Sequence, residues 1–245
     1  MEKLYIIVPA YNEAENIRRL IDDWYPVIER HPGNGESRLV VINDGSQDRT
    51  YEILKECARS RPLLEPLTKP NGGHGPTLLC GYRYAIKNKA DYIFQTDSDG
   101  HTLPEEFEDF WIKRKRYDAV LGDRRDRQDG MSRVFVENTL RMILRLFFGV
   151  RIPDANAPFR LMKRELVEKY IDRMPGDFNL PNVMLTTFFV YYKEKILFSP
   201  VTFKPRQGGK TSVNIRKIIQ IGWKALGDFR KLKKQMIMHK KGSAR

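Results

Sequence analysis

The stretch Gln95-Thr-Asp-Ser-Asp-Gly-His101 decides how this sequence is interpreted. It ends a short apolar run over residues 91–96 that predicts a buried β-strand, and it places Asp97 and Asp99 directly at the strand end. Two carboxylates two residues apart can bring oxygen ligands to Mg²⁺ or Mn²⁺, which favour one or two carboxylates together with substrate phosphates. His101 is a candidate third ligand, and an imidazole favours Mn²⁺. A solvated acidic turn that caps the next helix is the competing interpretation.

Polar segments of the same kind follow two other predicted strands. Apolar runs at 4–10, 38–43 and 63–68 predict strands, and the segments between them have helical periodicity. Strands that alternate with helices of ten or more residues predict an α/β fold, with a mostly parallel central sheet and helices on both faces. Ligands of such sheets bind beyond the carboxyl ends of the strands. We therefore expect one crevice to gather the polar segments at 9–13, 44–48 and 97–101.

The second half of the chain is less regular. We expect a strand at 118–123, a helix at 132–148 and strands near 196–204. In the first half, Asn12 is a candidate N-cap for the first helix. The apolar residues from 213 to 238 follow helical spacing beside a face rich in Lys and Arg, which predicts a basic amphipathic helix.

The charge of the chain is concentrated at one end. The 245 residues include 44 Lys+Arg and 31 Asp+Glu, a net charge of +13, and residues 201–245 hold 13 of the basic side chains against one acid, Asp228. Such asymmetry indicates an anionic partner at that end. At 41% apolar residues the chain is too hydrophobic for general disorder. Two cysteines, Cys57 and Cys80, give no disulfide framework and favour a reducing compartment.

The sequence predicts a cytoplasmic protein. Its longest uncharged stretch, residues 178–192, is shorter than the ~20 apolar residues that a membrane-spanning helix needs. The apolar run near the N-terminus lacks the small-residue cleavage site of a signal peptide and is better explained as the first strand.

Four motifs follow one another along the chain: Val8-Pro-Ala-Tyr-Asn-Glu13, Val41-Ile-Asn-Asp-Gly-Ser46, Asn71-Gly-Gly-His-Gly75 and Gln95-Thr-Asp-Ser-Asp-Gly-His101. Together they resemble the family 2 inverting glycosyltransferases. The resemblance covers most of residues 4–212, is closest to the branch of polyprenyl-phosphate (dolichyl-phosphate) mannosyl- and glucosyltransferases, and implies the GT-A fold. We expect a GT-A catalytic domain over 1–212 and a basic amphipathic helix and tail over 213–245.

For the donor, the resemblance implies contacts along the first two motifs. Pro9, Tyr11 and Glu13 would lie against the nucleoside of a nucleotide-diphosphate sugar, and Asp44 would accept hydrogen bonds from the base edge. Packing and capping at a helix start are the competing roles of Tyr11 and Glu13.

The resemblance implies that the fourth motif binds the metal ion. Asp97, with Ser98 beside it, would lie near the ribose and the metal, and Asp99 would be the principal metal ligand. The metal would offset the charge that develops on the leaving nucleoside diphosphate.

Basic residues of the second half are candidates for binding phosphate. Arg124 and Arg133 are expected to meet an acceptor phosphate or the donor diphosphate. Arg206 and Lys210 lie in a stretch that resembles the flexible basic loop closing over the diphosphate. Their competing interpretation is solvated surface charge. Residues 154–160 resemble the acceptor-side segment of the family but lack its Ser-Gly.

The need for a general base depends on the acceptor. A lipid phosphate is already anionic near neutral pH, so no side chain has to remove a proton from it. A sugar hydroxyl does need a base, and Asp177 is the candidate by sequence order. The alternative for Asp177 is a helix N-cap.

The sequence thus predicts a metal-dependent inverting glycosyltransferase that moves one hexose to a polyprenyl phosphate at the cytoplasmic membrane face. The Gln-x-x-Arg-Trp segment of processive members is missing from the sequence. Transfer to a saccharide hydroxyl in surface polysaccharide assembly is the alternative activity. A nucleic-acid-binding module acting through the basic tail is the non-enzyme alternative, but it leaves the carboxylates at the strand ends unexplained. The tail helix either contacts an anionic membrane surface or packs on the body.

Overall fold

The chain folds around a seven-stranded sheet with the strand order β3-β2-β1-β4-β6-β5-β7. The computed structural model describes residues 1–124, 131–203 and 215–242, and for 131–135, 215–224 and 239–242 the backbone alone. Every pairing in the sheet is parallel except those of β6, which runs antiparallel to β4 and β5. The strands are β1 Leu4–Ala10, β2 Arg38–Asn43, β3 Leu64–Thr68, β4 Tyr92–Gln95, β5 Ala119–Asp123, β6 Arg160–Lys163 and β7 Ile196–Pro200.

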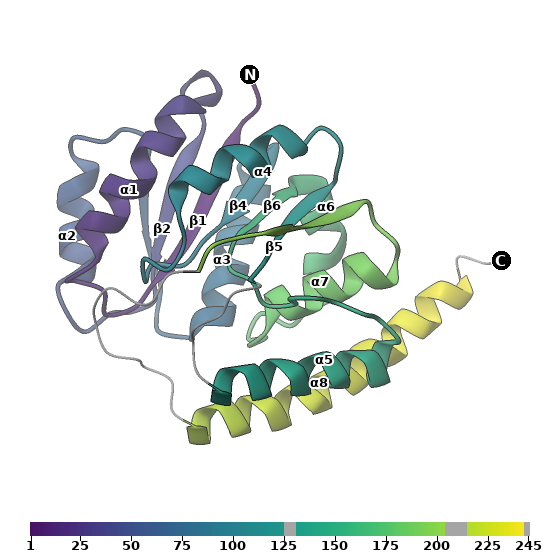
Figure 1. Cartoon of the computed structure of the whole chain (residues 1–245). Helices are drawn as coiled ribbons and strands as arrows, with labels where there is room; N and C mark the ends of the chain where they lie inside the picture. Colours follow the sequence, from purple (N-terminus) through teal and green to yellow (C-terminus); the bar gives the residue numbers. More distant parts are fainter. Residues whose placement is uncertain (125–130, 204–214, 243–245) are drawn as a thin grey trace.

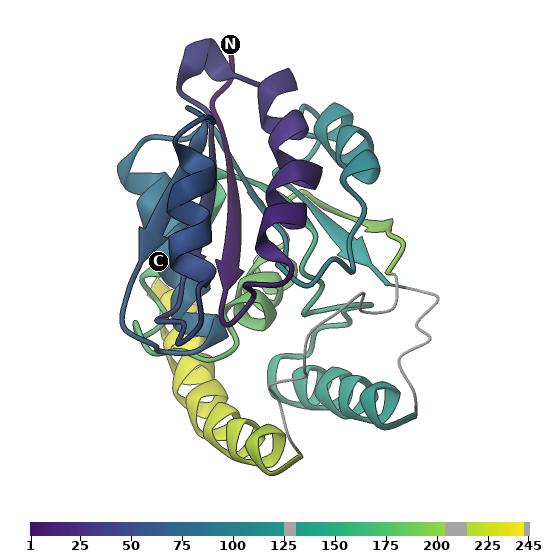
Figure 2. The same ribbon diagram turned by 90° about the vertical axis from the view of Figure 1, so that its left-hand side faces the viewer.

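Helices cover both faces of this sheet (Figures 1 and 2). Helices α1, α2 and α4 pack in one hydrophobic core, whereas α3, α6 and α7 pack in the other, together with α5 and α8. The predicted α/β architecture with a mostly parallel sheet is therefore confirmed. The helices are α1 Ile17–Arg30, α2 Thr50–Ala58, α3 His74–Lys87, α4 Phe107–Lys113, α5 Met131–Phe148, α6 Arg164–Ile171, α7 Pro181–Tyr191 and α8 Ile215–Gly242.

Strand β1 separates the two cores. All seven of its residues are buried, and they alternate: Leu4 and Ile6 face one core, whereas Tyr5 and Ile7 face the other. A strand covered on both faces has no polar side, which is why the sequence shows a continuous apolar run here.

The apolar stripe of α8 packs on the body of the protein. Phe229, Leu232 and Met236 are buried in the same core as α7, and the Phe229 ring meets Phe148 of α5 edge to face at 5.7 Å between centroids. For these residues, the predicted amphipathic helix uses its apolar face for packing. The division of the chain at residue 212 stays a prediction.

One expectation about local structure is wrong, and one strand was not predicted. Asn12 does not cap a helix, because α1 begins only at Ile17; Asn12 instead has a positive φ of 54° and accepts a hydrogen bond from the backbone N–H of Gln47 (2.9 Å). The sequence also gave no sign of β6, a four-residue strand that lies between β4 and β5. In the part of the chain that the structure describes, we find no helix with the length and apolar character needed to cross a membrane.

Helix α3 approaches the sheet most closely at Gly81. A Cβ atom at this position would lie 2.4 Å from Ile7 Cγ2 and 2.9 Å from Ile42 Cδ1. We expect Gly81→Ala to lower the free energy of unfolding in urea, because overpacking of about 1–3 kcal/mol outweighs the gain of about 0.5–1 kcal/mol that alanine brings to a helix. The control is Gly227→Ala, at an exposed position of α8 where no atom lies within 4 Å of the new Cβ. It should leave the free energy of unfolding unchanged or raised. Equal effects of the two substitutions would contradict this close packing.

Candidate active site

The polar segments at the ends of β1, β2 and β4 meet at one edge of the sheet, as predicted. The first two are tied by hydrogen bonds from Asn12 N to Ser46 Oγ (2.9 Å) and from Glu13 N to Thr50 Oγ1 (2.8 Å). The third approaches through Asp97, whose Oδ1 lies 3.9 Å from Nε2 of His74 at the start of α3. Four separate segments of the chain thus build one site.

Asp44 organises the glycine-rich loop before α3. Its buried carboxylate accepts hydrogen bonds from the backbone N–H groups of Gly72 (2.9 Å) and Gly73 (2.8 Å), and it pairs with Lys69. Gly73 has a φ of +88°, a left-handed conformation that glycine adopts without strain. The predicted contact of Asp44 with a nucleoside base stays a prediction, because three donors already engage this carboxylate.

Lys69 is a site residue that the sequence analysis missed. Its ammonium group also donates to the carbonyl of Pro70 (2.8 Å) and is mostly buried. It follows β3 directly, so the rule that pointed to the ends of β1, β2 and β4 could have found it as well.

The first motif divides into structural and exposed residues. Glu13 is buried, accepts a hydrogen bond from Asn16 Nδ2 (2.7 Å) and has its carbonyl bonded by the backbone N–H of Ile17, so it shapes the start of α1. Pro9 is buried within β1. Tyr11 is exposed and available to a ligand, but its contact with a nucleoside stays a prediction.

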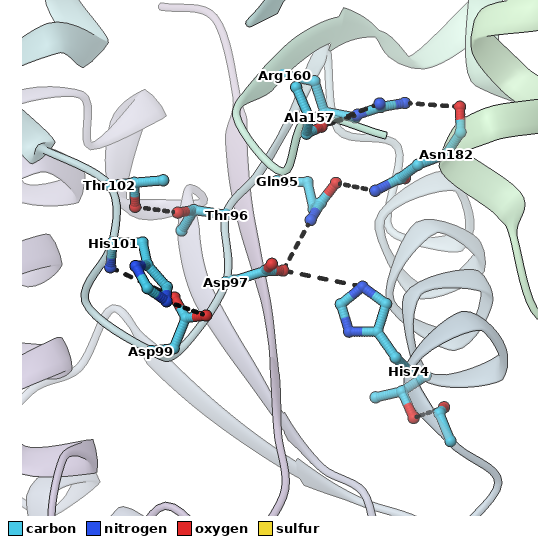
Figure 3. A network of polar contacts seen from close by, with 12 residues as sticks. His74, Gln95, Thr96, Asp97, Asp99, His101, Thr102, Ala157, Arg160 and Asn182 are labelled. Atoms are coloured by element: carbon cyan, nitrogen blue, oxygen red, sulfur yellow. Dashed lines mark hydrogen bonds and ion pairs between the residues drawn. The ribbon is translucent and has the colours of Figure 1, made fainter. Parts of the chain in front are cut away.

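Asp97 and Asp99 lie in the loop that follows β4 (Figure 3). Their side chains are 23% and 24% exposed. Asp97 Oδ1 accepts a hydrogen bond from Gln95 Nε2 (3.2 Å), and Asp99 Oδ2 lies 3.3 Å from His101 Nε2. The buried His101 ring stacks on Phe203, with 4.5 Å between the ring centroids, and Ser98 between the two carboxylates is buried as well.

The electrostatics of this pair suit a divalent cation. Burial raises the pKa of Asp97; His74 opposes the rise, and the neighbouring Asp99 carboxylate adds to it. A cation beside Asp97 would favour the charged form that burial disfavours. The carboxylate oxygens are the ligands that Mg²⁺ and Mn²⁺ take alongside diphosphate oxygens. Over the described residues no three His, Cys, Asp or Glu side chains form a ready metal site, so His101 as third ligand stays a prediction.

Arg124 is held by Asp154, in the segment over residues 154–160. Its Nε and Nη2 donate to the two carboxylate oxygens of Asp154, at 2.6 and 2.9 Å, and both side chains are buried. The guanidinium group also lies over the ring of Phe203, 5.1 Å from the centroid. Such a bidentate pair fixes the orientation of Arg124. Its contact with a phosphate stays a prediction.

Three further predicted residues cannot be placed. The side chain of Arg133, in the first turn of α5, lies outside the described residues, as do Arg206 and Lys210.

Asp177 is exposed on the turn before α7, whose N-cap is Leu180. The N-cap interpretation of Asp177 is therefore wrong, and its role as a base stays a prediction. The chain that follows it packs against α3, since the carbonyl oxygens of Phe178 and Asn179 lie 2.4 and 2.5 Å from a Cβ built on Gly75.

The sequence matches the family model described as glycosyl transferase family 2 over residues 5–171. It is 30% identical over 176 residues to a dolichyl-phosphate beta-glucosyltransferase of Trichomonas vaginalis, covering 65% of this chain and 51% of that protein. It is 24% identical to an undecaprenyl-phosphate 4-deoxy-4-formamido-L-arabinose transferase of Pectobacterium carotovorum, covering 90% of this chain and 65% of that protein. The chain therefore spans about half to two thirds of the length of these relatives.

Two solved structures with a similar fold contain a nucleotide sugar and Mn²⁺. Glucosyl-3-phosphoglycerate synthase from Mycobacterium tuberculosis, in complex with Mn²⁺, UDP-glucose and phosphoglyceric acid, has a TM-score of 0.66 at 17% identity, covering 93% of this chain and 80% of that one. A mannosyltransferase from Pyrobaculum calidifontis, in complex with GDP-mannose and Mn²⁺, has a TM-score of 0.56 at 20% identity, covering 84% of this chain and 58% of that one. The predicted GT-A fold is confirmed. Because the family model covers more than half of the chain and the four motifs gather at one edge of a GT-A sheet, this chain belongs to glycosyl transferase family 2.

Proposed function

We propose that this chain moves a single hexose from a nucleotide-diphosphate sugar to a polyprenyl phosphate at the cytoplasmic membrane face, with Mg²⁺ or Mn²⁺ bound at Asp97 and Asp99. The observation that carries the proposal is the partly buried carboxylate pair at the end of β4, beside the loop that Asp44 holds. The names of the relatives support the acceptor, since two of them transfer sugars to dolichyl or undecaprenyl phosphate.

The residues of the site have distinct tasks in this reaction. Asp97 and Asp99 would hold the metal ion, which offsets the charge that builds on the leaving nucleoside diphosphate. The loop at 69–73, fixed by Asp44, forms the side of the site next to α3. Arg124, oriented by Asp154, is a described cation whose fixed geometry would let it meet an incoming phosphate.

The nature of the acceptor decides whether a base is required. A polyprenyl phosphate oxygen is anionic near neutral pH and attacks the anomeric carbon without losing a proton first. With a saccharide hydroxyl as acceptor, in surface polysaccharide assembly, the exposed Asp177 would have to remove that proton. The lipid acceptor is favoured because the surface described next suits a membrane.

Helices α5 and α8 form a surface that is both apolar and basic. Leu146 and Met142 of α5 are 72% and 57% exposed, and Met238 of α8 is 65% exposed. An apolar face rimmed by cations is the chemistry of a helix that lies in the membrane interface. The two helices lie side by side (Figure 1), and the hollow between them is lined by Leu146, Phe147, Ile237, Arg230, Lys233 and Lys234.

Removal of one carboxylate of the pair should strongly reduce donor use. We expect Asp99→Asn to lower transfer about 10²–10³-fold, as the loss of one group that stabilises developing charge does.

A screen of UDP, GDP and dTDP with Mn²⁺ for a raised melting temperature identifies the donor base, since a ligand that binds only the folded state stabilises it. Asp99→Asn should remove that rise, whereas the exposed Asp172→Asn should keep it. Full activity of Asp99→Asn with Mn²⁺ would overturn the metal site.

The membrane surface can be tested with vesicles. We expect the double substitution Met142→Asp, Leu146→Asp to weaken binding to vesicles that contain phosphatidylglycerol at least tenfold, because each buried apolar side chain contributes about 1.5–3 kcal/mol. Ile112→Asp, at a position 73% exposed on α4, is the matched control and should bind like the unchanged protein. Co-sedimentation measures the binding. If the substitutions leave it unchanged while a soluble saccharide acceptor is still used, the alternative activity is favoured.

A further inference from the structure

A buried chain of polar groups leads from α3 and α7 to Asp97, and Figure 3 shows its last part, from Asn182 through Gln95 to Asp97. The Tyr82 hydroxyl of α3 lies 2.9 Å from Asn182 Oδ1, at the start of α7, and 3.2 Å from Gln95 Oε1. Asn182 Nδ2 donates to Gln95 Oε1 (2.9 Å), and Gln95 Nε2 donates to Asp97 Oδ1 (3.2 Å). Tyr82, Asn182 and Gln95 are all essentially inaccessible to solvent. The chain is therefore shielded from water up to the carboxylate.

The chain has a fixed direction. Burial raises the pKa of Tyr82, so its hydroxyl keeps the proton and donates it. An amide offers acceptors on its oxygen and donors on its nitrogen. Donation to Asn182 Oδ1 thus turns Asn182 Nδ2 towards Gln95 Oε1, and this in turn points Gln95 Nε2 at Asp97. Reversing either amide would bring donor against donor or acceptor against acceptor.

Arg160 anchors the same chain from the neighbouring strand. It is the register partner of Gln95 in the antiparallel pair of β6 and β4, and it is fully buried. Its guanidinium group donates to the carbonyl of Asn182 (3.2 Å) and twice to that of Ala157 (3.0 and 3.1 Å). Arg160 therefore ties the start of α7 to the acceptor-side segment that also contains Asp154.

We propose that Gln95 and Asn182 are positioning residues that hold the Asp97 carboxylate in the orientation needed for the metal and diphosphate of the donor. The contacts of Asp97 with Gln95 and His74 are both made by Oδ1, so among the described residues Oδ2 is the oxygen left to face a cation. Hydrogen bonds behind a metal ligand typically change metal affinity or activity 10–100-fold. This inference rests on the proposed function, because it assigns Asp97 to donor binding.

Near-isosteric apolar substitutions test the chain. We expect Gln95→Met and Asn182→Leu each to weaken the binding of Mn²⁺ alone by about 10–100-fold, measured from the spin resonance of free Mn²⁺. Binding of the nucleoside diphosphate selected in the melting screen should weaken by about the same factor. In turnover, the donor KM should rise while the acceptor KM stays unchanged. Thr187→Val is the matched control: Thr187 is buried on α7 and donates within its own helix to Val183 O (2.7 Å), so donor affinity should not change.

The double substitution shows whether Asn182 and Gln95 act in series or independently of each other. If Asn182 acts through Gln95, the Gln95→Met, Asn182→Leu protein should bind the donor about as weakly as Gln95→Met alone, since groups that act in series are not additive. Additive losses would overturn the proposal. Tyr82→Phe removes only the first hydroxyl and should give a smaller loss in the same direction. If Gln95→Met or Asn182→Leu melts below the assay temperature, Tyr82→Phe replaces it as the test. Unchanged donor affinity in folded Tyr82→Phe would likewise overturn the proposal.

The two proposals fail in different ways. If the unchanged protein binds neither Mn²⁺ nor any nucleoside diphosphate, the proposed function is wrong. If the unchanged protein binds them and folded Gln95→Met binds them equally well, Asp97 keeps its orientation without help and only the positioning role is wrong.

Discussion

The site depends on the position of β1 between β2 and β4 in the sheet. β1 pairs in parallel with β2 on one side and with β4 on the other, with Ala10 opposite Asn43 and Ile7 opposite Gln95. Parallel neighbours end at the same edge, so the residues that follow the three strands must meet there. A slip of one residue in β4 would turn Gln95 to the opposite face of the sheet. Because both faces of β1 are buried, the cores themselves select the register.

The sequence predicts those strands and helices in which apolar residues form a continuous run or recur with a regular spacing. Strands β1 to β5 and the helices between them carry that signal, and the polar strand ends located most of the site. Strand β6 carries none, because Arg160 and Lys163 flank only two apolar residues. Arg160 can be buried only because the carbonyls of Ala157 and Asn182 surround it, and the latter lies 22 residues away in the chain. Partners of this kind arise from tertiary structure and leave no periodic pattern in the sequence.

Periodicity likewise finds an apolar stripe without identifying what covers it. The stripe on α8 packs on the body through Phe229 and Met236. The largest exposed apolar side chains at this end of the molecule include Leu146 and Met142 of α5, a helix whose pattern gave no reason to expect an open surface. A lipid and a protein core are equally apolar, so the hydrophobic pattern alone cannot tell them apart. Charge adds the missing information, because the exposed side of α8 is basic.

The number of hydrogen-bond donors around each carboxylate separates two residues that look alike in the sequence. Asp44 is buried but accepts from Lys69 and from two backbone N–H groups, so its charge is compensated and its task is to hold a loop. Asp97 accepts from the Gln95 amide, burial raises its pKa, and the Asp99 carboxylate lies close by. Burial and the neighbouring carboxylate both disfavour the charged form of Asp97, and a cation beside it would favour that form. Asp44 therefore holds the loop in place, whereas Asp97 and Asp99 are the pair that we propose binds the metal.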